Sequence, residues 1–181
     1  MPDSCTLLVI GGLNLDLRLP VPRLPVPGET QTATVFTRQP GGKGANQAVA
    51  VAHLGARTAM LGCVGNDDAA RLLLGTLQEA GIAIETIAHC AEPTGTAVIL
   101  LAPSGENSIV VAPGANSMLS PAHLLRHKTM LTGAGMILPQ LETPMAVLEQ
   151  TLAIATEIGV PVMLDPAPAA PLSQKLLRQV A

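Results

Sequence analysis

The chain has 181 residues, 48% of them hydrophobic and 13% charged, which allows one domain with a substantial core and excludes a disordered chain. Its net charge of −3 gives no basic surface for DNA or an anionic membrane, and Phe36, the one aromatic residue, provides no platform for stacking single-stranded bases. With no apolar run of about 18 residues and no Lys- or Arg-led apolar start, neither a membrane-spanning helix nor a signal peptide is expected.

The first forty residues predict three strands. Residues 6–12 are an apolar run that ends in glycines, which is typical of a buried parallel strand. Residues 13–20 alternate apolar with polar side chains and predict a strand with one solvent-facing side. Four prolines make residues 20–28 a loop, and the Thr- and Val-rich residues 29–38 predict another strand.

Helices and strands alternate in the next stretch. Apolar residues at helical spacing predict a helix over residues 45–52, followed by a strand over residues 57–64. Asn66 is a suitable N-cap for a second helix, which Gly81 ends, and a strand over residues 82–88 follows.

The last third of the chain begins with a hairpin of residues 94–101 and 106–112 around a four-residue turn. Ser120 and Thr143 each precede a proline, and each is expected to cap a helix whose first residue is that proline. Further short elements are strands over residues 136–138 and 160–164 and a final amphipathic turn over residues 172–180.

The alternation of strands with helices along the chain predicts an α/β fold with a parallel sheet flanked by helices. The strand pair over residues 13–38 and the hairpin over residues 94–112 do not fit a series of βαβ units. We therefore expect them to form a separate small sheet.

The stretch Pro40 to Ala48, read PGGKGANQA, is rich in glycine but matches neither common phosphate-binding loop. A P-loop requires Ser or Thr after its lysine, and Gly44 follows Lys43 here. The dinucleotide fingerprint requires a glycine where Gln47 stands. The loop is therefore expected to bind another kind of ligand.

Polar side chains fall at the carboxyl ends of predicted strands, where open α/β sheets bind their ligands. Carboxylates accept hydrogen bonds from vicinal hydroxyls, while Lys and Asn donate to sugar oxygens, and glycines let the backbone approach. The sequence thus predicts a site for a hydroxyl-rich small molecule, formed by Asn14, Asp16, Gly41, Gly42, Lys43, Asn46 and Glu142.

Several motifs resemble those of the ribokinase-like, or PfkB, carbohydrate kinases, in order along almost the whole chain. They are Gly12-x-Asn14-x-Asp16, Pro27 to Thr30, Gly41 to Ala48, Gly114-Ala115-Asn116 and Asp165 to Ala169. The resemblance implies a three-layer, Rossmann-like parallel sheet with a small β-sheet lid, whose strands are expected at about residues 13–38 and 94–112. It also implies sugar contacts by Asn14, Asp16, Gly42, Lys43, Asn46 and Glu142.

By the same resemblance, the activity expected is ATP-dependent phosphorylation of a pentose hydroxyl, D-ribose to ribose 5-phosphate. ATP with Mg²⁺, and K⁺ as a further ion, are implied for the complete enzyme, and a homodimer is implied through the lid sheet. The family's Asn-x-x-Glu and Asp-Thr-x-Gly-Ala-Gly-Asp segments, which carry the ATP site and the catalytic base, have no copy in residues 1–181. We therefore expect the N-terminal part of a kinase domain, truncated on its C-terminal side and nearly inactive alone.

Two alternatives stay open. The chain can be a non-catalytic sugar-binding or dimerising fragment, or it can come from a kinase of another sugar or a nucleoside, although the shortage of aromatic residues disfavours a nucleoside base. Asp165 stands where these kinases commonly have Asn, which bears on the choice of sugar. His123 and His127 lie four residues apart without a third ligand, so we expect an exposed helix face and no metal site.

The three cysteines are far apart in the sequence, odd in number and without C-x-x-C spacing. We expect Cys5, Cys63 and Cys90 to be buried thiols of a reducing cytoplasm.

Overall fold

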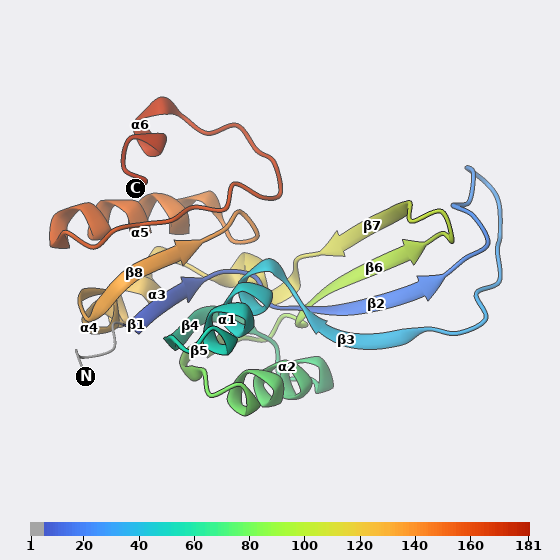
Figure 1. The fold of residues 1–181 in the computed structure, drawn as a ribbon, viewed down its shortest axis with the longest axis horizontal. Coiled ribbons are helices and arrows are strands. Elements are labelled where there is room, and N and C mark those ends of the chain that lie inside the picture. Colours follow the sequence, from blue (N-terminus) through green and yellow to red (C-terminus); the bar gives the residue numbers. More distant parts are fainter. Residues whose placement is uncertain (1–5) are drawn as a thin grey trace.

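The computed structural model describes residues 6–181, and its strands form two four-stranded sheets (Figure 1). One sheet is parallel, with the order β5-β4-β1-β8, where β1 is Thr6–Ile10, β4 is Arg57–Val64, β5 is Ala83–His89 and β8 is Ala134–Pro139. The small sheet has the order β3-β2-β6-β7, where β2 is Asn14–Pro20, β3 is Thr37–Gly41, β6 is Gly95–Leu101 and β7 is Asn107–Ala112. The predicted α/β fold with a separate small sheet is confirmed.

The parallel sheet is covered on both faces, which explains why its strands are almost continuously apolar. Successive residues of β1 point to opposite faces, so that Val9 packs under the first two long helices and Leu8 and Ile10 pack against the later ones. The first layer consists of α1 (Lys43–His53) and α2 (Asp68–Glu79), and the second of α3 (Pro121–Arg126), α4 (Lys128–Thr132) and α5 (Met145–Ile158). Two short elements complete the fold, η1 (Gly114–Met118) and α6 (Gln174–Leu177).

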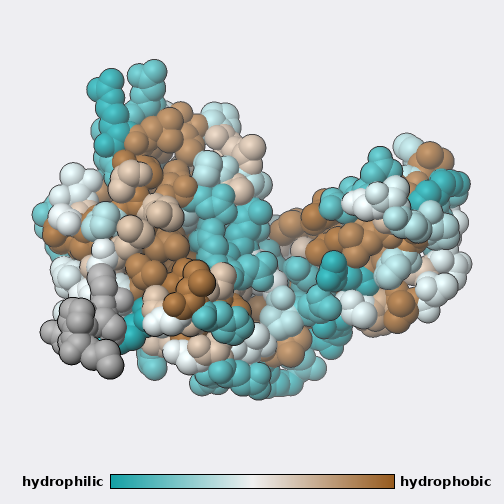
Figure 2. Space-filling view, in the orientation of Figure 1, coloured by the Kyte–Doolittle hydropathy of each residue, from teal (hydrophilic) through white to brown (hydrophobic). Residues whose placement is uncertain are grey.

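The small sheet extends away from this α/β body (Figure 1). Only three residues separate β1 from β2. Strand β2 pairs antiparallel with β3 and parallel with β6, and β6 forms the predicted hairpin with β7. Its apolar residues include several exposed ones, among them Val98, Ile109, Val110 and Val111. Figure 2 shows a hollow between the body and the small sheet, with hydrophobic residues along the sheet's side of it.

The strand predicted over residues 29–38 is wrong, because the chain pairs with β2 only from Thr37 to Gly41. The preceding segment is a loop held by its own polar contacts. The Glu29 carboxylate pairs with Arg23 and accepts a hydrogen bond from the Val26 amide at 3.0 Å. These contacts hold the pKa of Glu29 at about 2, with Arg23 as the larger cause.

Three smaller predictions also differ from the structure. The N-cap of α2 is Asp67, whose Oδ1 accepts from the Ala70 amide at 2.8 Å, and not Asn66. Thr143 does not cap α5, because Pro144 occupies the N-cap position. Of residues 160–164, only Val162 forms a β-bridge, to Ile137, so no strand forms there.

Cys63 and Cys90 come together although they are far apart in the sequence. Cys63 is buried and Cys90 is half-buried, while Cys5 lies outside the described residues. Burial, followed by the neighbouring Cys90 thiol, raises the pKa of Cys63 to about 12, so this thiol stays protonated at neutral pH. No helix within residues 6–181 combines the length and the apolar character needed to cross a membrane.

Candidate functional site

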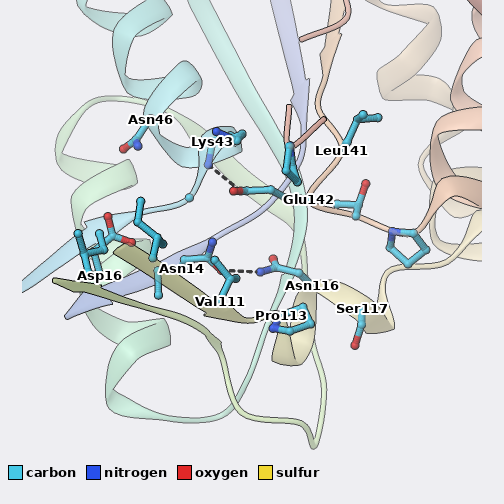
Figure 3. A pocket seen from close by; sticks show the side chains of 17 residues that line it. Asn14, Asp16, Lys43, Asn46, Val111, Pro113, Asn116, Ser117, Leu141 and Glu142 are labelled. Carbon is cyan, nitrogen blue, oxygen red and sulfur yellow. Dashed lines mark hydrogen bonds between the residues drawn. The ribbon is translucent and has the colours of Figure 1, made fainter. Parts of the chain in front are cut away.

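A cleft of about 770 Å³ lies where the small sheet meets the body (Figure 3). Its floor comes from the start of β2 and of α1, one wall comes from the small sheet, and the other comes from the segment after β8. The residues that line it are Asn14, Asp16, Gly42, Lys43, Asn46, Ala97, Ile99, Ile109, Val111, Pro113, Asn116, Ser117, Leu141, Glu142, Thr143, Pro144 and Pro168.

The glycine-rich loop needs bare backbone because it runs directly over the β1–β2 junction. Gly42 has φ 90°, and a Cβ there would lie 2.6 Å from the Gly12 carbonyl oxygen. The Ala45 amide donates to the same oxygen at 3.2 Å. This close approach places the first turn of α1, with Lys43 and Asn46, on the cleft.

Glu142 closes the cleft from the opposite side. Its Oε2 accepts a hydrogen bond of 2.7 Å from the Lys43 backbone amide at the start of α1, where a helix has unpaired amides (Figure 3). Burial raises the pKa of Glu142, and the hydrogen bond and charge of Lys43 only partly counter this. The carboxylates of Asp16 and Asp165 raise the pKa of Glu142 further.

Asp16 presents a second carboxylate from β2. Burial raises its pKa and the charge of Arg18 lowers it in part. Gly41 makes room for this side chain, because a Cβ on Gly41 would lie 2.3 Å from the Asp16 Cγ. Gly41 itself does not line the cleft, so its contribution is the space that it leaves for Asp16.

A chain of side-chain amides lies beside the cleft. Gln140 is fully buried and donates from Nε2 to Gln47 Oε1 at 2.6 Å, and Gln47 donates from Nε2 to Asp165 Oδ2 at 3.0 Å. Within residues 6–181, the buried Gln140 Oε1 has no hydrogen-bond partner. Asp165 is thus placed as an acceptor for Gln47.

Six of the seven predicted site residues line this one cleft: Asn14, Asp16, Gly42, Lys43, Asn46 and Glu142. Their contact with a sugar stays a prediction. Sequence reasoning missed two features of the site. One is Asn116, which stood in the quoted Gly114-Ala115-Asn116 motif without a role. The other is an apolar wall of Ala97, Ile99, Ile109 and Val111, which the alternation along the hairpin could have revealed.

The two histidines do not form a metal site with other side chains. The rings of His123 and His127 lie 4.7 Å apart, and Nε2 of His123 lies 2.8 Å from the Thr86 carbonyl oxygen. Among residues 6–181, no group of three or more His, Cys, Asp or Glu side chains is placed to hold a metal ion.

The sequence matches the pfkB family carbohydrate kinase over residues 5–181, nearly the whole chain. The chain belongs to the pfkB family. This pfkB chain is 43% identical to a ribokinase of Haemophilus influenzae over 175 residues, which are 95% of the chain and 56% of the relative. It is 40% identical to a ribokinase of Bacillus subtilis, over 93% of the chain and 58% of the relative.

Solved structures agree with the family. The chain superposes on Arabidopsis thaliana ribokinase in complex with ribose and ATP with a TM-score of 0.87 and 33% identity, over 98% of this chain and 58% of that one. Ribokinase from Thermotoga maritima gives a TM-score of 0.86 and 36% identity, over 97% and 57%. The pfkB chain thus spans a little over half the length of the ribokinases that it matches.

Proposed function

We propose that this pfkB chain binds D-ribose in the cleft and holds its primary hydroxyl for phosphorylation by ATP. The observation that carries the proposal is the convergence of Asn14, Asp16, Lys43, Asn46 and Glu142, from three separate segments, on one cleft. A pentose hydroxyl both donates and accepts hydrogen bonds. The carboxylates of the cleft can accept hydrogen bonds from such hydroxyls, and its amide and ammonium groups can donate to them.

The apolar wall of the cleft, which the small sheet provides, suits a sugar better than a more polar metabolite. Ala97, Ile99, Ile109 and Val111 form an apolar surface opposite the polar groups. A pentose ring has C–H groups on its faces and hydroxyls on its edge, so that it matches a site with one apolar and one polar side. A nucleoside base would lack an aromatic partner among these lining residues.

In this proposal, the described residues bind and orient the sugar. Phosphoryl transfer depends mainly on positioning and on electrostatic stabilisation of the transferred group, which ATP with Mg²⁺ brings to the reaction. We place the nucleotide, its ion and the base that takes the hydroxyl proton in the part that corresponds to the remaining length of the related ribokinases, which this chain does not cover. On that basis, the 181 residues alone bind ribose with little kinase activity.

The apolar small sheet supports a further part of the proposal, namely a homodimer. Its exposed hydrophobic residues include Val98, Ile109, Val110 and Val111. Exposed hydrophobic residues on an uncovered sheet commonly mark an interface with another protein surface. We propose that two small sheets pack together in the complete enzyme, which acts in the cytoplasm.

Asp16 offers the sharpest test. We expect Asp16→Ala to weaken D-ribose binding by about 1.5–3 kcal/mol in calorimetry, the range for hydrogen bonds to charged groups. Glu85→Ala, which removes an exposed carboxylate on β5, is the matched control and should bind like the wild type. A folded Asp16→Ala variant with unchanged affinity would remove Asp16 from the site.

A coupled ATP assay separates a kinase from a non-catalytic sugar-binding protein. Ribose-dependent ADP formation by the complete protein supports the kinase, and ribose binding without turnover supports the alternative. A panel of other pentoses and adenosine tests the substrate class, and a preference for adenosine would contradict the proposal.

A further inference from the structure

Asn116 is a buried side chain that links η1 to the junction between the two sheets. It is 1% exposed, and its amide makes three hydrogen bonds to residues about a hundred positions away. Its Oδ1 accepts from the Leu13 amide at 2.9 Å, and its Nδ2 donates to the Leu13 carbonyl at 3.1 Å. Its Nδ2 also donates to Asn14 Oδ1 at 2.8 Å (Figure 3). Both hydrogens of Nδ2 are therefore used.

The orientation of the Asn116 amide is dictated by groups that cannot change roles. The Leu13 amide can only donate and the Leu13 carbonyl can only accept, so that Oδ1 and Nδ2 of Asn116 must lie as they do. Since Nδ2 is the atom that faces Asn14, the Asn14 side chain must turn its oxygen toward Asn116. The donor group of Asn14 is then directed away from Asn116.

Asn14 is 2% exposed and lines the cleft. Among the described residues, no acceptor takes a hydrogen bond from its Nδ2, although its Oδ1 is paired. This Nδ2 is not among the buried side-chain atoms that lack a partner, so it is accessible from the cleft that Asn14 lines. The free Nδ2 therefore marks a position in the cleft at which a ligand oxygen can accept a hydrogen bond.

The fold provides room for this pair of amides. A Cβ on Gly95 would lie 2.2 Å from Asn14 Oδ1 and 2.3 Å from Asn116 Nδ2, so that only glycine fits on β6 at this point. The Ala115 amide donates to the Pro93 carbonyl at 2.8 Å and fixes η1 next to the start of β6.

We propose that Asn116 is a positioning residue for sugar recognition, which holds Asn14 with its Nδ2 toward the cleft so that Asn14 donates to a sugar oxygen. The inference rests on the proposed ribose-binding function. In this inference Asn116 orients the Asn14 side chain and does not itself contact the reacting atoms.

The test is the variant Asn116→Asp in a double-mutant cycle with Asn14→Ala, measured as D-ribose affinity by calorimetry. Asp keeps an acceptor for the Leu13 amide but has no donor for Asn14, so Asn14 turns its Nδ2 toward the new carboxylate. We expect a loss of affinity of about tenfold or more, equivalent to about 1.4 kcal/mol. Asn14→Ala should cost about tenfold in the wild type but less than about threefold in the Asn116→Asp background, because interacting residues are not additive.

Two additional variants keep the result interpretable. Gly95→Ala adds a methyl group between the two amides without a change of charge, and it should reproduce the loss of affinity if Asn116→Asp does not fold. Thr151→Val alters a buried residue that bonds only within α5, and it should bind ribose like the wild type. Thermal unfolding establishes which variants are folded.

The outcomes are distinguishable. Wild-type affinity in a folded Asn116→Asp or Gly95→Ala variant, or an equal cost of Asn14→Ala in both backgrounds, overturns the role of Asn116 and leaves ribose binding intact. An absence of ribose binding by the wild type overturns the proposed function, and the inference with it.

Discussion

The backbone amide of Lys43 donates a hydrogen bond of 2.7 Å to the Glu142 carboxylate, across 99 positions of sequence. This bond joins the start of α1, on the floor of the cleft, to the segment after β8, which forms one wall. A Cβ on Gly12 would lie 2.4 Å from the same carboxylate oxygen. Glycine at this strand end is therefore a condition for the contact.

The raised pKa values of Glu142 and Asp16 predict a pH dependence of ribose affinity. Burial is the main cause for both carboxyls, whose ordinary values are 4.5 and 3.8. Because protonated carboxyls accept hydrogen bonds less well, affinity should fall on acidification, beginning at a pH above these ordinary values. Calorimetry in steps between about pH 7 and pH 4 measures the effect.

Glu142→Gln provides the control for this pH dependence. It removes one titrating group while it keeps the size of the side chain, so the fall in affinity should begin at a lower pH than in the wild type. A wild-type affinity that stays constant down to pH 4.5 would show that these carboxylates do not bind the ligand.

Asp67 is predicted to stabilise the fold far more than its neighbour Asp68. Asp67 caps α2 through the Ala70 amide at 2.8 Å and also accepts from the Thr94 amide and hydroxyl at 2.8 and 2.7 Å. We expect Asp67→Ala to lower the free energy of unfolding by about 1–2 kcal/mol, the usual value of an N-cap. Chemical denaturation measures it, with Asp68→Ala, which removes only an exposed ion pair to Arg71, as the control.

The contribution of Asp67 should also disappear in acid. Burial alone would raise its pKa, but the hydrogen bonds from Thr94 and Ala70 outweigh burial and lower the pKa from 3.8. A carboxyl with a lowered folded-state pKa stabilises the protein above its unfolded value, and this stability is lost as the pH falls through the folded value. The difference between the wild type and Asp67→Ala should thus be full at pH 7 and shrink below about pH 3.8, and a constant difference would contradict the assignment.

Two glycine substitutions should have opposite effects on stability. Gly75 lies inside α2 with nothing within 4 Å of an added Cβ, so Gly75→Ala should stabilise the protein by about 0.5–1 kcal/mol. Gly42 has φ 90° and no room for a Cβ beside the Gly12 carbonyl, so Gly42→Ala should destabilise it by more than about 1 kcal/mol. Thermal unfolding of both variants checks the pair, and similar shifts in the melting temperature would contradict this account of the loop.

The proposed homodimer can be tested on the two faces of the small sheet. Ile109 lies on the cleft side and Val110 on the opposite side, and they are 51% and 69% exposed. In sedimentation experiments on the complete protein, we expect the wild type to be a dimer and at least one of Ile109→Lys and Val110→Lys to be a monomer. A monomeric wild-type protein, or a dimer that survives both changes, would exclude the small sheet as the interface.

The parallel sheet could be predicted well because its strands carry strong local signals. Strand β4 has its predicted bounds, residues 57–64, since an apolar run lies there between glycines. The position of β3 could not be predicted, because residues 29–38 have strand propensity but no partner until Thr37 reaches β2. The start of β3 is therefore set by its pairing with β2, which the local sequence does not reveal.

The candidate site likewise contains residues that could be predicted from the sequence and residues that could not. Lys43 and Glu142 were predicted because polar groups at strand ends and helix starts are visible in the sequence. Asn116 could not be given a role, because its partners Leu13 and Asn14 lie about a hundred residues away and only the fold brings them together. The Asp67 cap was missed because Asn66 is an equally good candidate by composition.

The short connection between β1 and β2 has a mechanical consequence. Gly11, Gly12 and Leu13 are the residues that connect β1 of the body to β2 of the small sheet. Asp16 therefore belongs to the small sheet, whereas Glu142 follows a strand of the parallel sheet. A molecule that bonds to both carboxylates at once would connect the two sheets, so that its binding would favour any relative placement of the sheets in which both bonds form.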